Sequence, residues 1–177
     1  MSSYCVIGSG ISGATIANLL SQKNSVEIYD KGRGPGGRSS FKRLGKLKGF
    51  DHGTQYVSPK TNKFKQFIKE LIKKKILKTW TGKHVFLNKT KKENKNHIKI
   101  IGRRGNNDVV KYLIKNIYCA FKSELEKIKY RDKKWQLTFK DGKIKNFDKL
   151  ILTCPFPQLS KLSKKFIKDP FIKKKLK

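Results

Sequence analysis

The chain has 177 residues, 36% of them hydrophobic and 32% charged, so it is long enough to bury an apolar core as an ordinary globular domain. Its 44 Lys and Arg against 12 Asp and Glu give a formal net charge of +32 at pH 7. No apolar run approaches the roughly 18 residues of a membrane span, and the start lacks the basic region of a secretory signal. These features exclude an integral membrane helix and lead us to expect a soluble, cytoplasmic protein.

The charge makes a polyanion a partner to consider, either nucleic acid or an anionic membrane surface. However, the lysines are spread along the chain, Arg is scarce, and Ile and Asn are abundant, which is typical of AT-biased coding. Such a bias would also raise Glu, so it does not explain the deficit of acidic residues. We favour a solvated basic surface over a polyanion-binding one, and an acidic partner chain remains a third alternative.

The first thirty residues predict a β-α-β unit. Residues 4–7 and 26–29 are short apolar runs typical of buried strands, and residues 13–22 between them have helical spacing. The side chains expected to face inward from this helix are Ile16, Leu19 and Leu20. The glycine- and arginine-rich residues 32–49 show no period and predict a loop.

The rest of the chain alternates helical and extended patterns. Residues 61–78 and 109–121 are amphipathic and predict helices. Residues 83–101 predict a hairpin with a long polar loop, and a turn at Asp141-Gly142 lies between further predicted strands at 135–139 and 149–153. The tail after residue 158 shows only helical fragments. We expect the amphipathic helix at 61–78 to pack against the domain rather than lie on a membrane.

The cysteines do not form a metal or disulfide pattern. Cys5, Cys119 and Cys154 are odd in number and far apart, and each lies in an apolar stretch. The three histidines have no ligand spacing with them. We therefore expect buried thiols and no metal site.

A glycine motif follows the first predicted strand. Gly8, Gly10 and Gly13 form a G-x-G-x-x-G between that strand and the helix, the arrangement that lets a backbone approach a dinucleotide pyrophosphate. Ser12 lies at the positive end of the helix dipole. Asp30, 17 residues beyond Gly13, ends the second strand, where an acid binds the adenosine ribose. Because a carboxylate would repel a 2′-phosphate, the motif favours NAD or FAD over NADP.

A second glycine segment distinguishes these two cofactors. Gly36-Gly37-Arg38 follows Asp30 by six to eight residues. In flavoproteins of the amine-oxidase type, a segment of this kind crosses the cofactor, and its arginine neutralises pyrophosphate charge. Ordinary NAD dehydrogenases lack it, so the segment favours FAD.

Several segments together resemble renalase-like proteins, a branch of the FAD-dependent amine-oxidase superfamily. They are residues 6–18, 30–40 and 50–57, and more weakly 101–106 and 150–158. The resemblance implies an oxidoreductase that transfers hydride from a reduced nicotinamide-type or amine small-molecule substrate to FAD and then passes electrons to oxygen. It also implies that Gln55 and Tyr56 lie near the isoalloxazine ring and that the backbone of Leu125 meets adenine.

Motif and resemblance together give the expected cofactor site, although no catalytic acid or base can be named. The residues expected there are Gly8, Gly10, Ile11, Ser12, Gly13, Asp30, Lys31, Gly36, Gly37, Arg38, Gln55, Tyr56 and Leu125. Two other functions remain as alternatives. One is an NAD-binding Rossmann module or dehydrogenase, and the other is a basic polyanion-binding module.

The expected fold is α/β, a Rossmann-like FAD/NAD(P)-binding fold with a parallel sheet and an antiparallel hairpin insertion. We expect residues 1–60 to form the dinucleotide-binding unit, 61–108 to begin a substrate-domain-like insertion, and 109–177 to return to the FAD-binding domain. Members of the family are considerably longer, and their C-terminal portion adds a strand and a Gly-Asp segment near the flavin. We therefore expect a half-built cofactor cradle, from a truncated reading frame, a stand-alone module or a split enzyme completed by a separate chain.

Overall fold

The computed structural model describes residues 1–45, 48–81, 98–169, 172 and 174. These form two compact units, unit 1 (Met1–Gly37 with Leu113–Lys177) and unit 2 (Arg38–Tyr112). Compact units are not the same division as functional domains, so the domain bounds expected from the sequence stay a prediction. Within the described ranges, no helix has both the length and the apolar composition to cross a bilayer.

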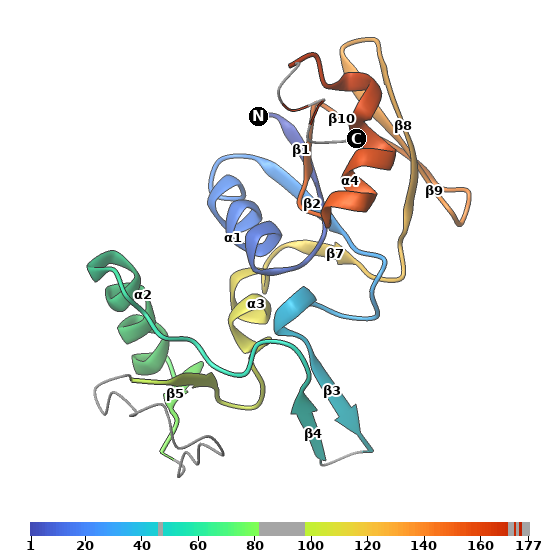
Figure 1. Cartoon of the computed structure of the whole chain (residues 1–177). Helices are drawn as coiled ribbons and strands as arrows, with labels where there is room; N and C mark the ends of the chain where they lie inside the picture. The colour runs from blue at the N-terminus through green and yellow to red at the C-terminus, as the bar shows by residue number, and fades with distance from the viewer. Residues whose placement is uncertain (46–47, 82–97, 170–171, 173, 175–177) are drawn as a thin grey trace. The chain divides into compact units, whose positions relative to one another are not determined.

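Unit 1 contains a parallel four-stranded sheet (Figure 1). Its strands are β1 (Ser3–Ile7), β2 (Ser25–Tyr29), β7 (Tyr118–Ala120) and β11 (Lys149–Leu152), in the order β11-β1-β2-β7. Helix α1 (Ile11–Leu20) connects β1 to β2, the crossover that parallel neighbouring strands require. The predicted Rossmann-like β-α-β unit is thus confirmed.

The face of α1 that packs inward differs from the prediction. Its buried residues are Gly13, Ala14 and Ala17, whereas Leu19 is 57% exposed, so the expectation that Leu19 faces inward was wrong. Small side chains let the helix approach the sheet closely, with Ile16 and Leu20 half-buried and Leu19 left on the outer side. Asn18 fixes the helix further, because its Nδ2 donates to the carbonyl of Leu113 at 2.7 Å.

A three-stranded antiparallel sheet completes the core of unit 1. Its strands are β8 (Leu125–Arg131), β9 (Lys134–Phe139) and β10 (Ile144–Phe147), in the order β10-β9-β8. The Phe139 ring lies 4.5 Å from the ring of Tyr29, within a buried apolar cluster that also includes Leu137 and Phe147. The predicted strand at 135–139 and the turn at Asp141-Gly142 are confirmed.

The sequence pattern of β8 did not predict a strand. A register shift between Leu125 and Lys127 breaks the two-residue alternation, so the buried residues Leu125 and Ile128 are three apart. This spacing imitates one turn of a helix. The predicted helix at 109–121 was wrong in its second half, because Tyr118–Ala120 pairs with β2 as strand β7. Only α3 (Asp108–Leu113) is helical.

The described tail of unit 1 is helical. It consists of α4 (Phe156–Ser163) followed by a short 3-10 helix, η2 (Lys164–Phe166). The Phe166 ring packs edge-on against Trp135 of β9 at 5.1 Å. These are the helical fragments that the sequence indicated.

Unit 2 begins with a hairpin where the sequence predicted only a loop. After the 3-10 helix η1 (Gly37–Ser39), β3 (Phe41–Leu44) and β4 (Lys48–Asp51) pair as antiparallel strands. The expectation of a loop over 32–49 is therefore wrong beyond η1. Because the side chains of β3 are almost all exposed, the strand lacks the apolar alternation that would have revealed it.

The helix and sheet that follow form the remainder of unit 2. Helix α2 (Asn62–Lys73) is shorter than the predicted 61–78, because Lys75 adopts a φ of 58° and the chain then enters β5 (Leu77–Thr79). Strand β5 pairs with β6 (Ile100–Gly102). The predicted hairpin over 83–101 lies largely outside the described residues.

The buried side chain of Asn106 organises unit 2. Its Oδ1 accepts a hydrogen bond from the N–H of Gly102 at 2.8 Å, and its Nδ2 donates to the carbonyls of Thr54 at 2.6 Å and Gln55 at 3.0 Å. Its own N–H donates to Asp51 Oδ1 at 2.7 Å. Asn106 thereby fixes the backbone next to Tyr56.

We expect Asn106→Ala to lower the free energy of unfolding by about 2–3 kcal/mol, because one buried backbone N–H and two partly buried backbone carbonyls lose their partner together. Urea unfolding followed by circular dichroism measures this change. Asn62→Ala, at the exposed first residue of α2, is the control and should change the stability much less. Equal stability of Asn106→Ala and the parent protein would contradict the assigned role.

Candidate functional site

The first glycine turn lies between β1 and α1. Gly8 has a φ of +105°, a conformation that a residue with a side chain rarely adopts, and its N–H donates to the carbonyl of Tyr29 at 2.9 Å. A Cβ on Gly13 would lie only 1.9 Å from the carbonyl oxygen of Gly8. Both positions therefore require glycine, as the motif predicted.

Thr153, which follows β11 directly, hydrogen-bonds to this turn. Its hydroxyl lies 2.9 Å from the carbonyl oxygen of Ile7 and 3.2 Å from that of Gly8. A Cβ on Gly8 would lie 2.7 Å from the same hydroxyl. We did not identify Thr153 as a site residue from its pattern, because only the pairing of β11 with β1 brings it to the turn.

The start of α1 is free to receive an anion. Gly10 is the N-cap residue and has an extended backbone, no side chain caps the helix, and its first turn contains no acidic residue. The first N–H groups of a helix lack partners within the helix, and the dipole is positive there. A phosphate would satisfy both features, so the residues present fit the pyrophosphate of a dinucleotide.

The second glycine segment runs beside the first. The N–H of Gly36 donates to the carbonyl of Ser9 at 3.0 Å, and Gly36 and Gly10 form a parallel bridge. Gly37 has a φ of +53°, and a Cβ there would lie 3.1 Å from the Cα of Gly10. The two glycine segments, which are more than twenty residues apart in the sequence, thus expose backbone atoms to the same space. The sequence predicted both segments, but not that they touch.

Asp30 is held in a fixed orientation at the end of β2. Its Oδ2 accepts hydrogen bonds from the N–H and the hydroxyl of Ser9, both at 2.6 Å, and its Oδ1 accepts one from the N–H of Gly32 at 2.7 Å. A carboxylate has about four acceptor positions, so one remains for a ribose hydroxyl. Ser9 is 0% exposed, and it is a positioning residue that we did not identify from the sequence.

The cradle is the surface formed by residues 8–13, Asp30 and residues 36–37, and the other residues of unit 1 expected at the site differ in their exposure. Ile11 and Lys31 are exposed, in keeping with contact to a ligand. The N–H of Lys122 donates to the carbonyl of Gly32, and that of Ser123 donates to the carbonyl of Asp30, which draws the start of β8 towards Asp30. The Leu125 side chain itself is buried in the core.

Arg38, Gln55 and Tyr56 belong to unit 2. The Arg38 carbonyl accepts hydrogen bonds from the N–H and hydroxyl of Thr54, and its guanidinium is exposed. A Cβ on Gly53 would lie 2.0 Å from the Arg38 carbonyl oxygen, so glycine is required for this approach. Within unit 2 the structure therefore brings Arg38 beside the segment that contains Gln55 and Tyr56.

The Tyr56 ring is part of an aromatic group. Its centroid lies 5.9 Å from that of Trp80, and the Nζ of Lys99 lies over the Tyr56 ring at 5.2 Å. At 38% exposure, Tyr56 is available to a ligand rather than buried in the core.

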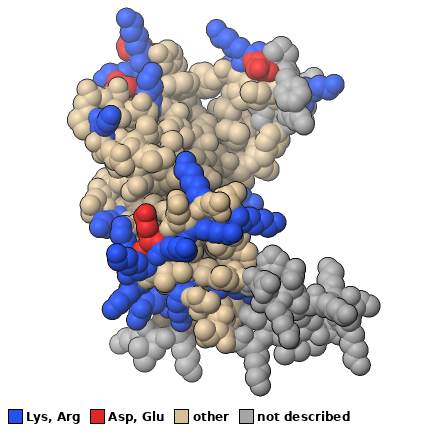
Figure 2. Space-filling view, turned by 90° about the vertical axis from the view of Figure 1, so that its left-hand side faces the viewer, with Lys and Arg blue, Asp and Glu red and all other residues tan. Residues whose placement is uncertain are grey.

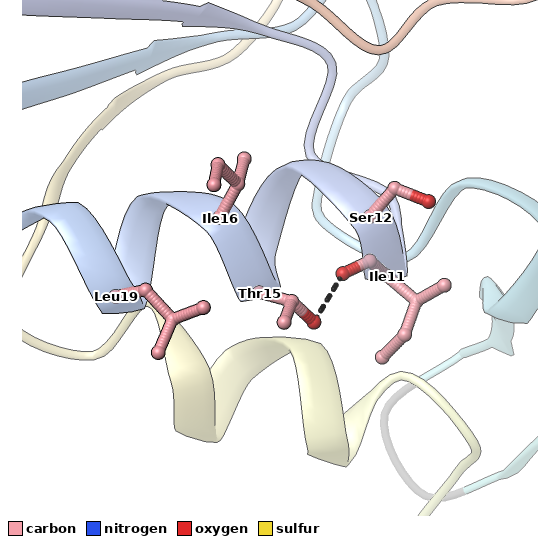
Figure 3. Close-up of a pocket in the computed structure, with 5 residues that line it drawn as sticks. All are labelled: Ile11, Ser12, Thr15, Ile16 and Leu19. Atoms are coloured by element: carbon pink, nitrogen blue, oxygen red, sulfur yellow. Dashed lines mark hydrogen bonds between the residues drawn. The ribbon is translucent and has the colours of Figure 1, made fainter.

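An apolar hollow of about 350 Å³ lies on the outer side of α1 (Figure 3). It is lined by Ile11, Ser12, Thr15, Ile16 and Leu19, and the Thr15 hydroxyl donates to the carbonyl of Ile11 at 2.8 Å. Its only polar side chains are the hydroxyls of Ser12 and Thr15, so it offers no reactive chemistry. It shares Ile11 and Ser12 with the cradle.

The three cysteines are free thiols. Cys5 is buried, and Cys119 and Cys154 are partly buried. Burial raises the pKa of Cys119 to about 11 and also raises the pKa values of Cys5 and Cys154, so all three are protonated at neutral pH. Among the described residues, no group of His, Cys, Asp and Glu could hold a metal ion.

Comparison with protein families decides the class of protein. Residues 79–176, more than half of the chain, match the model of the flavin containing amine oxidoreductases. The chain belongs to this family. Residues 6–71, which contain both glycine segments, match an NAD(P)-binding Rossmann-like domain. Membership of the family supports a flavin cofactor.

Individual relatives cover most of this chain. Mouse renalase (Mus musculus) is 28% identical over an alignment of 173 residues that covers 92% of this chain and 49% of renalase. The chain thus spans about half the length of this curated relative. The match agrees with the predicted renalase-like character.

Solved structures show the same fold. The tetracycline destructase Tet(51) has a TM-score of 0.58 at 22% identity, over 88% of this chain and 39% of that one. A protein provisionally named protoporphyrinogen oxidase, from Exiguobacterium sp. 255-15, has a TM-score of 0.66 at 11% identity, over 91% and 61% of the two chains. These identities are low, so the likeness concerns the fold alone.

We expect Ser9→Ala to weaken binding of ADP-ribose about tenfold, because the Asp30 carboxylate loses a charge-assisted hydrogen bond that orients it. Isothermal titration calorimetry measures the affinity. Ser163→Ala removes another buried hydroxyl, which donates to the carbonyl of Leu159 in α4, and should leave the affinity unchanged. Equal affinities of Ser9→Ala and the parent protein would show that Ser9 does not position Asp30.

Proposed function

We propose that this chain binds FAD and is the cofactor-binding portion of a renalase-like oxidoreductase. The observation that carries the proposal is the contact between the two glycine segments, in which Gly36 and Gly37 lie against Ser9 and Gly10. A Rossmann turn alone would suit NAD equally well. The second segment adds a backbone surface beside the pyrophosphate position and leads directly into Arg38.

Each part of the cofactor has a proposed partner. The N–H groups at the start of α1 and the Arg38 guanidinium would bind the pyrophosphate, because both are positive and Arg can bind phosphate oxygens in pairs. The oriented Asp30 carboxylate would accept a hydrogen bond from the ribose, and the backbone near Leu125 would meet the adenine. Gln55 and Tyr56 would lie near the isoalloxazine ring.

The proposed reaction follows from the family and from the cofactor. When bound, FAD would accept hydride from a reduced nicotinamide-type or amine small molecule and then pass electrons to oxygen. The protein's own contribution would be binding and orientation. The chain covers about half of renalase, so we propose that further cofactor contacts come from residues outside this sequence, in the same or a separate polypeptide.

An NAD-binding module is the second candidate, because residues 6–71 match an NAD(P)-binding Rossmann-like domain. It explains the first glycine turn and Asp30. It gives no role to the close approach of Gly37 to Gly10, and a purified NAD-binding module would be colourless.

We expect the purified chain, incubated with FAD and desalted, to keep a flavin absorption spectrum at close to one FAD per chain. Asp30→Ala and Arg38→Ala should each weaken FAD binding about tenfold, through loss of a ribose contact and a pyrophosphate contact respectively. The matched controls are Asp141→Ala and Arg131→Ala, at exposed positions in unit 1 outside the cradle, and they should retain FAD as the parent does. A folded, colourless chain that binds NAD would contradict the proposal in favour of the second candidate.

A further inference from the structure

The positive charge of the chain is unevenly distributed. Residues 60–78 contain eight lysines and a single acidic residue, Glu70, whereas residues 1–37 contain three basic and two acidic residues. Biased coding would raise the lysine content of both segments. The concentration in one segment therefore needs a local explanation.

The lysines of α2 form a row along one side of the helix. Lys65, Lys69 and Lys73 follow one another at intervals of four residues, which places them on the same face about 6 Å apart along the axis. All three are exposed. Like charges at this spacing repel and destabilise a helix, so the row does not serve the stability of α2.

The fold of unit 2 uses the other side of α2. Ile68 and Leu71 are buried there, and the Thr61 hydroxyl caps the helix by accepting a hydrogen bond from the N–H of Phe64. Lys74, the C-cap residue of α2, is also engaged, because its Nζ donates to the Tyr112 hydroxyl at 2.7 Å. The row is thus the part of α2 that the fold leaves unused.

Some lysines outside α2 have acidic partners. In unit 1, Lys134 pairs with Asp148 at 3.8 Å, Lys140 with Glu124 at 2.8 Å and Lys143 with Asp141 at 2.8 Å. None of the three row lysines forms an ion pair with a described residue. Figure 2 shows lysine and arginine side chains gathered over α2, with few acidic side chains among them.

We propose that the row Lys65, Lys69 and Lys73 binds the phosphate backbone of a nucleic acid. Lysines spaced about 6 Å apart along a helix axis can contact successive charges of a linear polyanion, and each contact releases counterions. The contact would involve phosphates and not bases, so we expect binding without sequence preference.

The structure favours nucleic acid over an anionic membrane. A helix that binds at a membrane surface buries its apolar face among the lipids, but the apolar face of α2 is already packed within unit 2. Phe64, at 39% exposure and stacked on Phe67, is the most exposed aromatic residue of the helix. Stable membrane binding needs a hydrophobic contact in addition to charge, and one partly exposed ring does not supply it.

The test uses the full chain and a fluorescein-labelled 20-base-pair DNA duplex, with binding followed by fluorescence anisotropy over a range of salt concentrations. The test variant carries Lys65→Gln, Lys69→Gln and Lys73→Gln together. The control variant carries Lys134→Gln, Lys140→Gln and Lys143→Gln, which removes the same charge from lysines that have acidic partners. Circular dichroism of both variants verifies that they are folded.

We expect the slope of log affinity against log salt concentration to be shallower by about 2.7 in the test variant, or 0.9 for each lysine removed. The affinity at 0.1 M salt should fall roughly 100-fold, while the control variant should retain nearly the parent slope and affinity. The α2 helix should be no less stable in the test variant, because the repulsion within the row is gone.

Three outcomes would overturn the proposal. Equal losses of DNA affinity in the two variants would show that binding depends on the total charge and not on the row. Absence of DNA binding by the parent chain at low salt would exclude the activity. Binding to phosphatidylserine vesicles that depends on the row, with no row-dependent binding to DNA, would assign the surface to a membrane instead.

Discussion

The close backbone approach of Gly36 and Gly37 to Ser9 and Gly10 is the constraint on which the rest of the site depends. A side chain at Gly37 would crowd the Cα of Gly10, and one at Gly13 would collide with the carbonyl of Gly8. The same turn places Ser9 where it orients Asp30. The proposed pyrophosphate position, the proposed ribose acceptor and the N-terminus of α1 therefore all depend on a single packed turn, to which Thr153 hydrogen-bonds from the neighbouring strand.

Residue patterns predicted the parts of this site that depend on local geometry. The G-x-G-x-x-G, Asp30 and the glycine doublet each have a meaning that can be derived from spacing and backbone freedom alone. The parallel sheet followed from the β-α-β order. What the patterns could not supply were contacts across long sequence separations. Thr153 reaches the turn through strand pairing, and Asn106 reaches Thr54 and Gln55 through the folding of unit 2.

The elements that the patterns misjudged share a physical cause. Strand β8 has a bulge and shows an apolar spacing of three, and β3 has almost no buried side chain, so neither displays the alternation of a strand. Leu19 has the spacing of an inward residue, but the residues of α1 that are buried are one glycine and two alanines. In each case the local apolar pattern did not reveal which side chains the tertiary fold buries.

The most direct test of the account is an NMR titration of the ¹⁵N-labelled chain with FAD, observed at assigned backbone amides. If the two glycine segments form one pyrophosphate cradle, the amides of Gly10, Ser12, Gly36 and Gly37 should shift together and saturate with a common affinity. Unchanged signals at these four amides, with shifts confined to the lysine row of α2, would show that FAD binds only as a polyanion and would contradict the account.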